Sequence, residues 1–167
     1  MRPFVPGAEA LFPELTVRIA DTLARLREVQ GVTVGCSAKR AVWSCGKTTL
    51  YQYLPLAEAP SRAAGRPVLI CFALVNRPYV LDLQPDRSLV RRLLEAGLSV
   101  YLIDWGDPDD ADRCVDLEDY IERHLGGSVR HLLDNHGAEA LDLLGVCQGG
   151  VLSLCYTALH GKQVANL

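Results

Sequence analysis

Residues 140–150, ALDLLGVCQGG, decide the fold of this chain. The apolar run over 140–146 predicts a buried strand, and the small and apolar residues over 149–160 predict a helix directly after it. Between the two, Gly145-Val146-Cys147-Gln148-Gly149 fits the pattern G-x-C-x-G. In the serine form of this pattern a nucleophile stands on a sharp turn from strand to helix, and glycines let the two elements approach without side-chain clashes.

Cys147 is therefore the candidate nucleophile of a strand–turn–helix elbow. Its thiol is predicted to project from the end of the strand at a helix N-terminus, where the helix dipole and free N–H groups favour negative charge. The backbone N–H of Gln148 is placed to donate to the oxyanion that forms when a nucleophile attacks a carbonyl group. The competing interpretation is a buried cysteine in the tight turn of another α/β protein.

The segments before the elbow alternate between strands and helices. Strands are expected at 67–74, 99–103 and 164–167, and helices at 86–96 and 117–135. The longer helix should bend at Gly126-Gly127. Strands separated by helices of this length pair in parallel through βαβ units. The predicted fold class is thus α/β with a mainly parallel sheet, and we expect it to be the front portion of a larger domain.

Residues 41–54 carry two interpretations. Their alternating pattern on either side of Gly46-Lys47 predicts a β-hairpin. Residues 41–48 also match a relaxed phosphate-binding P-loop with alanine in place of the first glycine. A P-loop needs an apolar strand before it and a helix after it. Here polar residues precede and strand-forming residues follow, so the hairpin is favoured and a nucleotide site is the alternative.

The first 35 residues form a separate segment in this scheme. An amphipathic helix is expected over 14–30, from apolar residues at helical spacing, namely Leu15, Ile19, Leu23 and Leu26. We therefore expect an N-terminal helical segment over 1–35 and part of a catalytic domain over 36–167.

Composition excludes several classes of protein. Hydrophobic residues make up 49% and charged residues 22% of the 167 residues, as in a globular protein with a core. A net charge of −3 offers no basic surface to nucleic acid. No window reaches the ~18 apolar residues of a membrane span, and the first residues lack a signal peptide's apolar region. We expect a cytoplasmic protein with reduced cysteines and no cofactor or metal, since no C-x-x-C pair occurs.

Three motifs stand in order along the chain: ALVNRPY at 73–79, YLIDWG at 101–106 and LLGVCQGG at 143–150. Together they resemble the catalytic subunit of class III poly(3-hydroxyalkanoate) synthases, from about Lys39 to Leu167. The resemblance implies an α/β-hydrolase fold and polymerisation of (R)-3-hydroxyacyl-CoA, commonly 3-hydroxybutyryl-CoA, with release of coenzyme A. It also implies a second, helical synthase subunit as partner and work at the surface of polymer granules.

The same resemblance implies roles for individual residues. Cys147 would carry the growing acyl chain as a thioester. The backbone N–H of Val75, in the loop after the first buried strand, would join that of Gln148 as the second oxyanion donor. Asp104 and Asn76 also match the family pattern, and we expect both to make buried structural hydrogen bonds.

The remaining members of a catalytic triad are missing after the nucleophile. In α/β-hydrolases the acid and the histidine follow the nucleophile along the chain, yet after Cys147 there is no Asp or Glu and a single histidine, His160. A helix of about ten residues is ~15 Å long, so His160 cannot easily reach back to the thiol. His124, His131 and His136 are expected to be solvated helix residues. We therefore expect a fragment that is inactive, or nearly so, by itself.

Two other functions stay open. One is a different enzyme on the same elbow, such as a thioesterase or a dienelactone-type hydrolase, which would release free acid rather than polymer. The other is a non-catalytic role, as a truncated gene product or an interaction protein of the polymer granule.

Overall fold

The computed structural model describes residues 35–60 and 65–167, which belong to one compact unit, Val34–Leu167. The predicted helix over 14–30, and nearly all of the predicted segment over 1–35, lie outside the described residues. None of the helices described is both long enough and apolar enough to cross a membrane.

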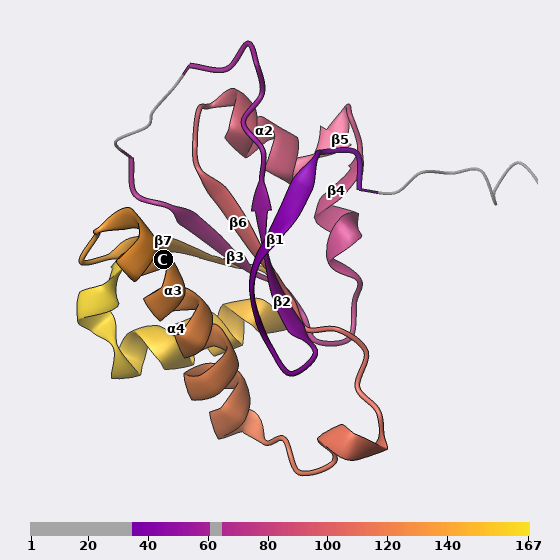
Figure 1. The fold of residues 1–167 in the computed structure, drawn as a ribbon, viewed down its shortest axis with the longest axis vertical. Helices are drawn as coiled ribbons and strands as arrows, with labels where there is room; N and C mark the ends of the chain where they lie inside the picture. Colours follow the sequence, from indigo (N-terminus) through magenta and orange to yellow (C-terminus); the bar gives the residue numbers. More distant parts are fainter. Residues whose placement is uncertain (1–34, 61–64) are drawn as a thin grey trace, which may run out of the picture. The chain divides into compact units, whose positions relative to one another are not determined.

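The described residues form a central six-stranded sheet (Figure 1). Its strands, in spatial order, are β1 (Lys39–Cys45), β2 (Thr48–Tyr53), β6 (Val100–Asp104), β3 (Val68–Cys71), β7 (Leu141–Gly145) and β8 (Val164–Asn166). The pairs β1–β2 and β2–β6 are antiparallel, whereas β6, β3, β7 and β8 run parallel to one another. The predicted α/β class with a mainly parallel sheet is confirmed.

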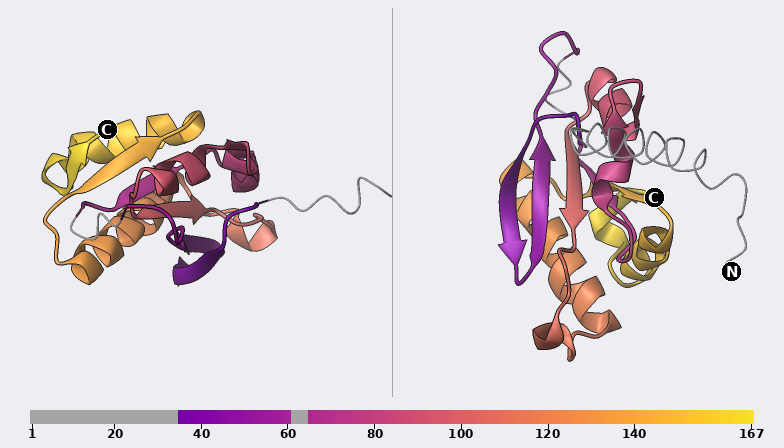
Figure 2. Two further views of the ribbon diagram at one scale, coloured as in Figure 1. Left: turned by 90° about the horizontal axis from the view of Figure 1, so that it is seen from above. Right: turned by 90° about the vertical axis from the view of Figure 1, so that its right-hand side faces the viewer.

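Helical segments connect the parallel strands and cover both faces of the sheet (Figure 2). The main ones are α2 (Leu89–Glu95), the π-helical η3 (Asp119–Leu125), α3 (Gly126–His136) and α4 (Gln148–Leu159). Shorter elements are η1 (Pro78–Leu81), β4 (Asp82–Gln84), β5 (Arg87–Ser88), η2 (Asp110–Asp112) and η4 (Gly161–Gln163).

Strand β3 lies at the centre of the sheet and is buried on both faces. Leu69 and Cys71 pack in a core cluster with η3, α3 and α4, whereas Ile70 and Phe72 pack with α2. A strand that faces helices on both sides must be apolar at every position. This explains why the sequence shows a continuous apolar run here, where a strand with one solvated face would alternate.

The hairpin interpretation of residues 41–54 is confirmed, and the P-loop interpretation is wrong. Cys45 pairs with Thr48 across a turn in which Gly46 has a φ of 57°. The segment after the turn is β2, so this loop does not lead into a helix as a P-loop does.

Two predicted helices differ from the observed ones. The helix expected over 86–96 begins at Leu89, because the Ser88 hydroxyl accepts a hydrogen bond from the Arg91 N–H at 2.8 Å and caps it. At Gly126-Gly127, where the sequence predicted a bend, the π-helix η3 passes directly into the α-helix α3, and the backbone is helical on both sides. Gly127 has a packing reason instead, because a Cβ there would lie 2.7 Å from the Trp43 ring.

The buried carboxylate of Asp82 connects three segments of this unit through hydrogen bonds: its own strand β4, the strand β5 and the residues before β1. Asp82, fully buried in β4, accepts hydrogen bonds from the Ser88 hydroxyl (2.5 Å), the Ser37 N–H (2.8 Å), the Ser37 hydroxyl (2.8 Å) and the Cys36 thiol (3.1 Å). Burial alone would raise the pKa of Asp82, but the four hydrogen bonds outweigh it and hold the pKa below its usual value. The ionised form of Asp82 therefore contributes to stability.

We expect this contribution to be lost in acid. Because the folded-state pKa of Asp82 is lowered, its contribution is fully present above the usual Asp pKa and disappears as the pH falls through the folded value. At pH 7, Asp82→Asn should lower the free energy of unfolding by about 2–3 kcal/mol, since an amide cannot accept from all four donors. Between pH 6 and about pH 3 the variant should lose less stability than the wild type.

Urea unfolding followed by circular dichroism measures both effects. Asp86→Asn is the matched control, because the Asp86 side chain is 77% exposed. Equal acid dependence in Asp82→Asn and the wild type would contradict the assignment.

Candidate active site

Cys147 occupies the sharp turn between β7 and α4. Its backbone has φ 58° and ψ −130°, and it is the only non-glycine residue with positive φ among the described residues. Such a conformation is strained for a residue with a Cβ and persists only where the surrounding structure enforces it. Cys147 is exposed rather than sealed in the interior. The predicted strand–turn–helix reversal is therefore present, with the thiol residue at its tip.

The glycines of the motif allow α4 to pack directly against β3. A Cβ at Gly149 would lie 2.0 Å from the Cys71 carbonyl oxygen and 2.7 Å from that of Phe72. A Cβ at Gly145 would lie 2.6 Å from the Gly150 Cα. Side chains at either position would push the helix away from the sheet, so the spacing of the motif has the steric reason that the sequence suggested.

The backbone N–H groups around the elbow divide into occupied and free ones. The Gly149 N–H donates to the Val146 carbonyl at 3.1 Å, and the Gly150 N–H donates to the Cys147 carbonyl at 2.9 Å. The Gln148 N–H has no acceptor among the described residues. It is the first N–H of α4, where the helix dipole favours negative charge.

The loop after β3 lies beside the elbow. The Val146 N–H donates to the Cys71 carbonyl at 2.9 Å, and the indole N–H of Trp105 donates to the Phe72 carbonyl at 3.0 Å. The Leu74 N–H donates to the side-chain oxygen of Gln148 at 3.2 Å. Sequence reasoning missed these contacts of Trp105 and Gln148, because they connect residues far apart in the chain.

Val75, the second predicted oxyanion position, is 84% exposed in this loop. Its N–H has no acceptor within residues 35–60 and 65–167. The Val75 side chain therefore points away from the core, while its backbone directly follows Leu74, which is hydrogen-bonded to Gln148 of the elbow.

Two small cavities adjoin this loop. One of about 170 Å³ and one of about 290 Å³ share Leu74, Val75, Trp105, Gly106 and Pro108 in their walls. Both lie at the edge of the sheet where β3 and β6 end, which is also the edge of the elbow.

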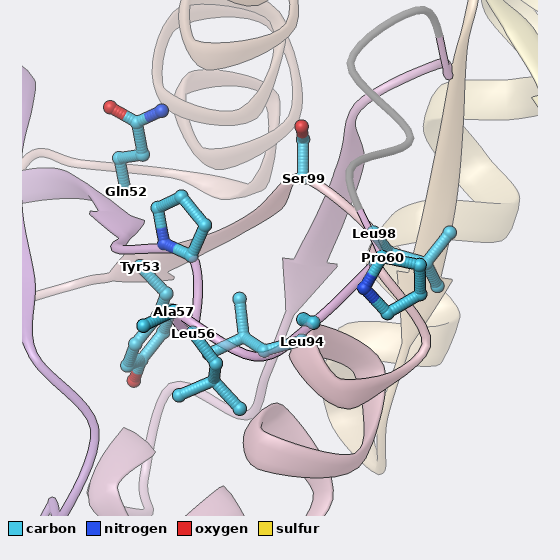
Figure 3. A pocket seen from close by; sticks show the side chains of 11 residues that line it. Gln52, Tyr53, Leu56, Ala57, Pro60, Leu94, Leu98 and Ser99 are labelled. Atoms are coloured by element: carbon cyan, nitrogen blue, oxygen red, sulfur yellow. The ribbon is translucent and has the colours of Figure 1, made fainter.

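Figure 3 shows a larger cavity, of about 560 Å³, whose wall does not include Cys147. Its wall is mainly apolar and includes Tyr53, Leu56, Leu94 and Leu98. Ser99, immediately before β6, also lines it, which places it at the edge where the parallel strands begin. Its size alone is no reason to assign it to the chemistry of Cys147.

The polar residues after β3 and β6 differ in part from expectation. Asp104 is half-buried and accepts a hydrogen bond from the Gly106 N–H at 3.1 Å, which is a structural role. The expectation that Asn76 is buried is wrong, because the loop has left the sheet at this point and Asn76 is exposed. Arg77 next to it pairs with Asp107 at 2.5 Å.

None of the four histidines bonds to Cys147 within the described residues. His160 lies at the C-terminal end of α4 and contacts the Glu122 carboxylate at 2.8 Å. His136 is exposed and shares a 2.8 Å hydrogen bond with the Tyr101 hydroxyl, and the half-buried His131 bonds to Asn135.

The expectation that His124 is solvated is wrong. It is 4% exposed, packed beside Tyr120, and burial lowers its pKa. Its helix packs against the sheet, which turns this position inward.

Cys71, beside the elbow in the central strand, shows the contrast with Cys147. It is fully buried, and burial raises the pKa of its thiol to about 12. A thiol in this state is a core residue and not a nucleophile.

Comparisons with known proteins match this chain to two families, whose matched residues overlap. Residues 9–93 match the family described as "Poly-beta-hydroxybutyrate polymerase (PhaC) N-terminus", and residues 66–167 match the family of the alpha/beta hydrolase fold. The poly(3-hydroxyalkanoate) polymerase subunit PhaC of Allochromatium vinosum is 45% identical over 150 residues, which cover 90% of this chain and 42% of that protein. The PhaC subunit of Thiocystis violacea is 40% identical over 171 residues, covering 100% of this chain and 47% of that protein.

A third relative, PhaC of Synechocystis, is 47% identical over 150 residues, covering 87% of this chain and 39% of that protein. The chain thus spans less than half the length of these curated relatives. Among solved structures, epoxide hydrolase A from Mycobacterium thermoresistibile superposes with a TM-score of 0.51 at 24% identity, covering 77% of this chain and 37% of that chain. This likeness supports the fold alone.

Two neighbouring glycines test the packing of the elbow. Gly149→Ala should lower the free energy of unfolding by about 3 kcal/mol, because its Cβ would overlap a backbone carbonyl that cannot move aside. Gly150→Ala should be neutral or raise stability by up to about 1 kcal/mol, since alanine favours helix and its Cβ would meet neighbours at 3.7 Å. Urea unfolding of both variants checks this, and equal destabilisation would contradict the observed contact.

Proposed function

We propose a function that proceeds from one premise: the chain belongs to the poly-beta-hydroxybutyrate polymerase (PhaC) family and has the α/β-hydrolase fold. In this function it takes part in making poly(3-hydroxyalkanoate) from (R)-3-hydroxyacyl-CoA, and Cys147 is the nucleophile. The observation that supports the proposal is the exposed cysteine in a positive-φ turn at the N-terminus of α4.

The reaction has two acyl-transfer steps. In the first, the Cys147 sulfur forms a bond to the carbonyl carbon of the acyl-CoA, and the bond from that carbon to the coenzyme A sulfur breaks. The thiol proton of Cys147 ends on the released coenzyme A. In the second, the hydroxyl oxygen of another hydroxyacyl unit forms an ester bond to the carbonyl carbon of the Cys147 thioester, and the bond from that carbon to the Cys147 sulfur breaks. The hydroxyl proton passes through a base to the released Cys147 thiolate.

Negative charge develops on the carbonyl oxygen in both steps. The N–H groups of Gln148 and Val75, which have no other acceptor among the described residues, are the proposed donors to this oxygen. Oxyanion donors act by being held in place before the charge appears. Gly145 and Gly149 contribute indirectly, because they permit the close packing that fixes the turn.

The two steps also need a general base. Three of the described histidines are bonded to other side chains, and His124 is buried. We therefore propose that the base and its orienting acid are supplied by polypeptide other than residues 35–60 and 65–167.

The proposed partners follow from the resemblance to class III synthases. They are a second, helical synthase subunit and the surface of a polymer granule in the cytoplasm. Co-sedimentation of the chain with polymer granules is the direct measurement of granule binding.

A chimeric polymerase tests the nucleophile. The matched 150 residues of the Allochromatium vinosum polymerase are replaced by their counterparts from this chain, and the product is assayed with (R)-3-hydroxybutyryl-CoA. We expect polymer, and coenzyme A release that falls by about a thousandfold or more in Cys147→Ala because the covalent intermediate cannot form. Cys114→Ala, at another exposed cysteine, should keep its activity.

The product separates this proposal from its alternatives. Polymer formation that survives in Cys147→Ala would refute the role of the thiol. Free 3-hydroxybutyrate without polymer would instead indicate a thioesterase.

A further inference from the structure

The geometry assigns a second role to Gln148, through its side chain. We propose that Gln148 is a positioning residue whose carboxamide oxygen holds the Leu74 N–H and so fixes the loop that presents the Val75 N–H to the oxyanion. This inference rests on the proposed acyl-transfer function of Cys147 and deepens it. One residue would then supply the first oxyanion donor from its backbone and orient the second with its side chain.

The first observation is how the loop after β3 is held. At the end of β3 the Cys71 carbonyl accepts from the Val146 N–H at 2.9 Å, and at the start of the loop the Phe72 carbonyl accepts from the Trp105 indole at 3.0 Å. The next hydrogen bond along the loop is donated by the Leu74 N–H to Gln148 Oε1 at 3.2 Å. These successive contacts connect the loop to the elbow and to the strand beside it.

The second observation is how exposed the loop becomes directly afterwards. Val75 is 84% exposed, Asn76 and Arg77 are also exposed, and η1 begins only at Pro78. An exposed backbone with few contacts samples several conformations. Without the Gln148 contact, the segment from Ala73 to Arg77 would have no hydrogen bond to the elbow among the described residues.

The third observation concerns which N–H groups remain available. A backbone N–H has one hydrogen, and the Leu74 hydrogen is taken by Gln148 Oε1. Directly after Leu74, the Val75 N–H has no acceptor among the described residues, so it is an available donor next to a residue that Gln148 holds. Fixing a donor before the reaction begins removes the cost of ordering it in the transition state.

Two reagents separate a positioning role from a merely structural one. p-Nitrophenyl acetate acylates a thiol through an oxyanion: the sulfur bonds to the carbonyl carbon and p-nitrophenolate leaves. Iodoacetamide alkylates the same sulfur by displacing iodide, and no oxyanion forms. Loss of an oxyanion donor should therefore slow the first reaction and leave the second unchanged.

The experiment uses the purified 167-residue chain and the substitution Gln148→Met, which keeps a long side chain but removes the oxygen acceptor. Val151→Met is the matched control, because it places the same side chain on α4 at a residue that is 59% exposed. Rates for Cys147→Ala are subtracted to remove reaction at the other cysteines. Peptide mass mapping locates the adduct on Cys147.

We expect Gln148→Met to slow acylation of Cys147 by about three- to tenfold, as for the loss of one hydrogen bond. Its alkylation should stay within about twofold of the wild type, and both reactions should be unchanged in Val151→Met. Equal acylation in Gln148→Met and the wild type would overturn the positioning role alone, as would equal slowing of both reactions. A wild-type chain acylated no faster than Cys147→Ala would overturn the proposed nucleophile as well.

Discussion

The candidate site depends on the close approach of the N-terminus of α4 to the carbonyl groups that end β3. At Gly149 there is no room for a single additional carbon atom, since it would lie 2.0 Å from the Cys71 carbonyl oxygen. This contact forces the chain to reverse within one residue, and that residue is Cys147 with its φ of 58°. The strain at Cys147 is thus a consequence of packing on either side of it, and the large core around β3 offsets the strain.

The same approach decides which backbone groups are available for chemistry. The carbonyl groups of Cys71 and Phe72 point toward donors from the elbow and from Trp105, and so they are satisfied inside the protein. The N–H groups of Gly149 and Gly150 are used by the first turn of the elbow. Among the residues that the structure describes, the N–H groups of Gln148, where the helix begins, and of Val75, where the loop leaves the sheet, have no acceptor, and both can donate to a bound oxygen.

The sequence predicted what is encoded locally and missed what depends on contacts between distant residues. The elbow, the hairpin at Gly46 and the apolar central strand could be predicted because glycine spacing and hydrophobic pattern determine each of them within a few residues. The burial of His124 and the exposure of Asn76 could not, because each depends on which neighbour a helix or loop meets after folding. The contact from Gln148 to Leu74, 74 positions apart, belongs to the same group, since nothing near either residue indicates the other.

The proposed chemistry also divides into two parts, the thiol with its oxyanion donors and the general base. The proposed nucleophile and oxyanion donors come from elements that meet at one edge of the sheet, namely the ends of β3 and β7 and the start of α4. They can be assembled by the described residues alone. Under the proposed function, a general base would approach the thiol from outside this arrangement, because α4 carries its histidine to the far end of the helix, where Glu122 holds it. A thiol suits such a division better than a hydroxyl, because it is the stronger nucleophile before any base assists it.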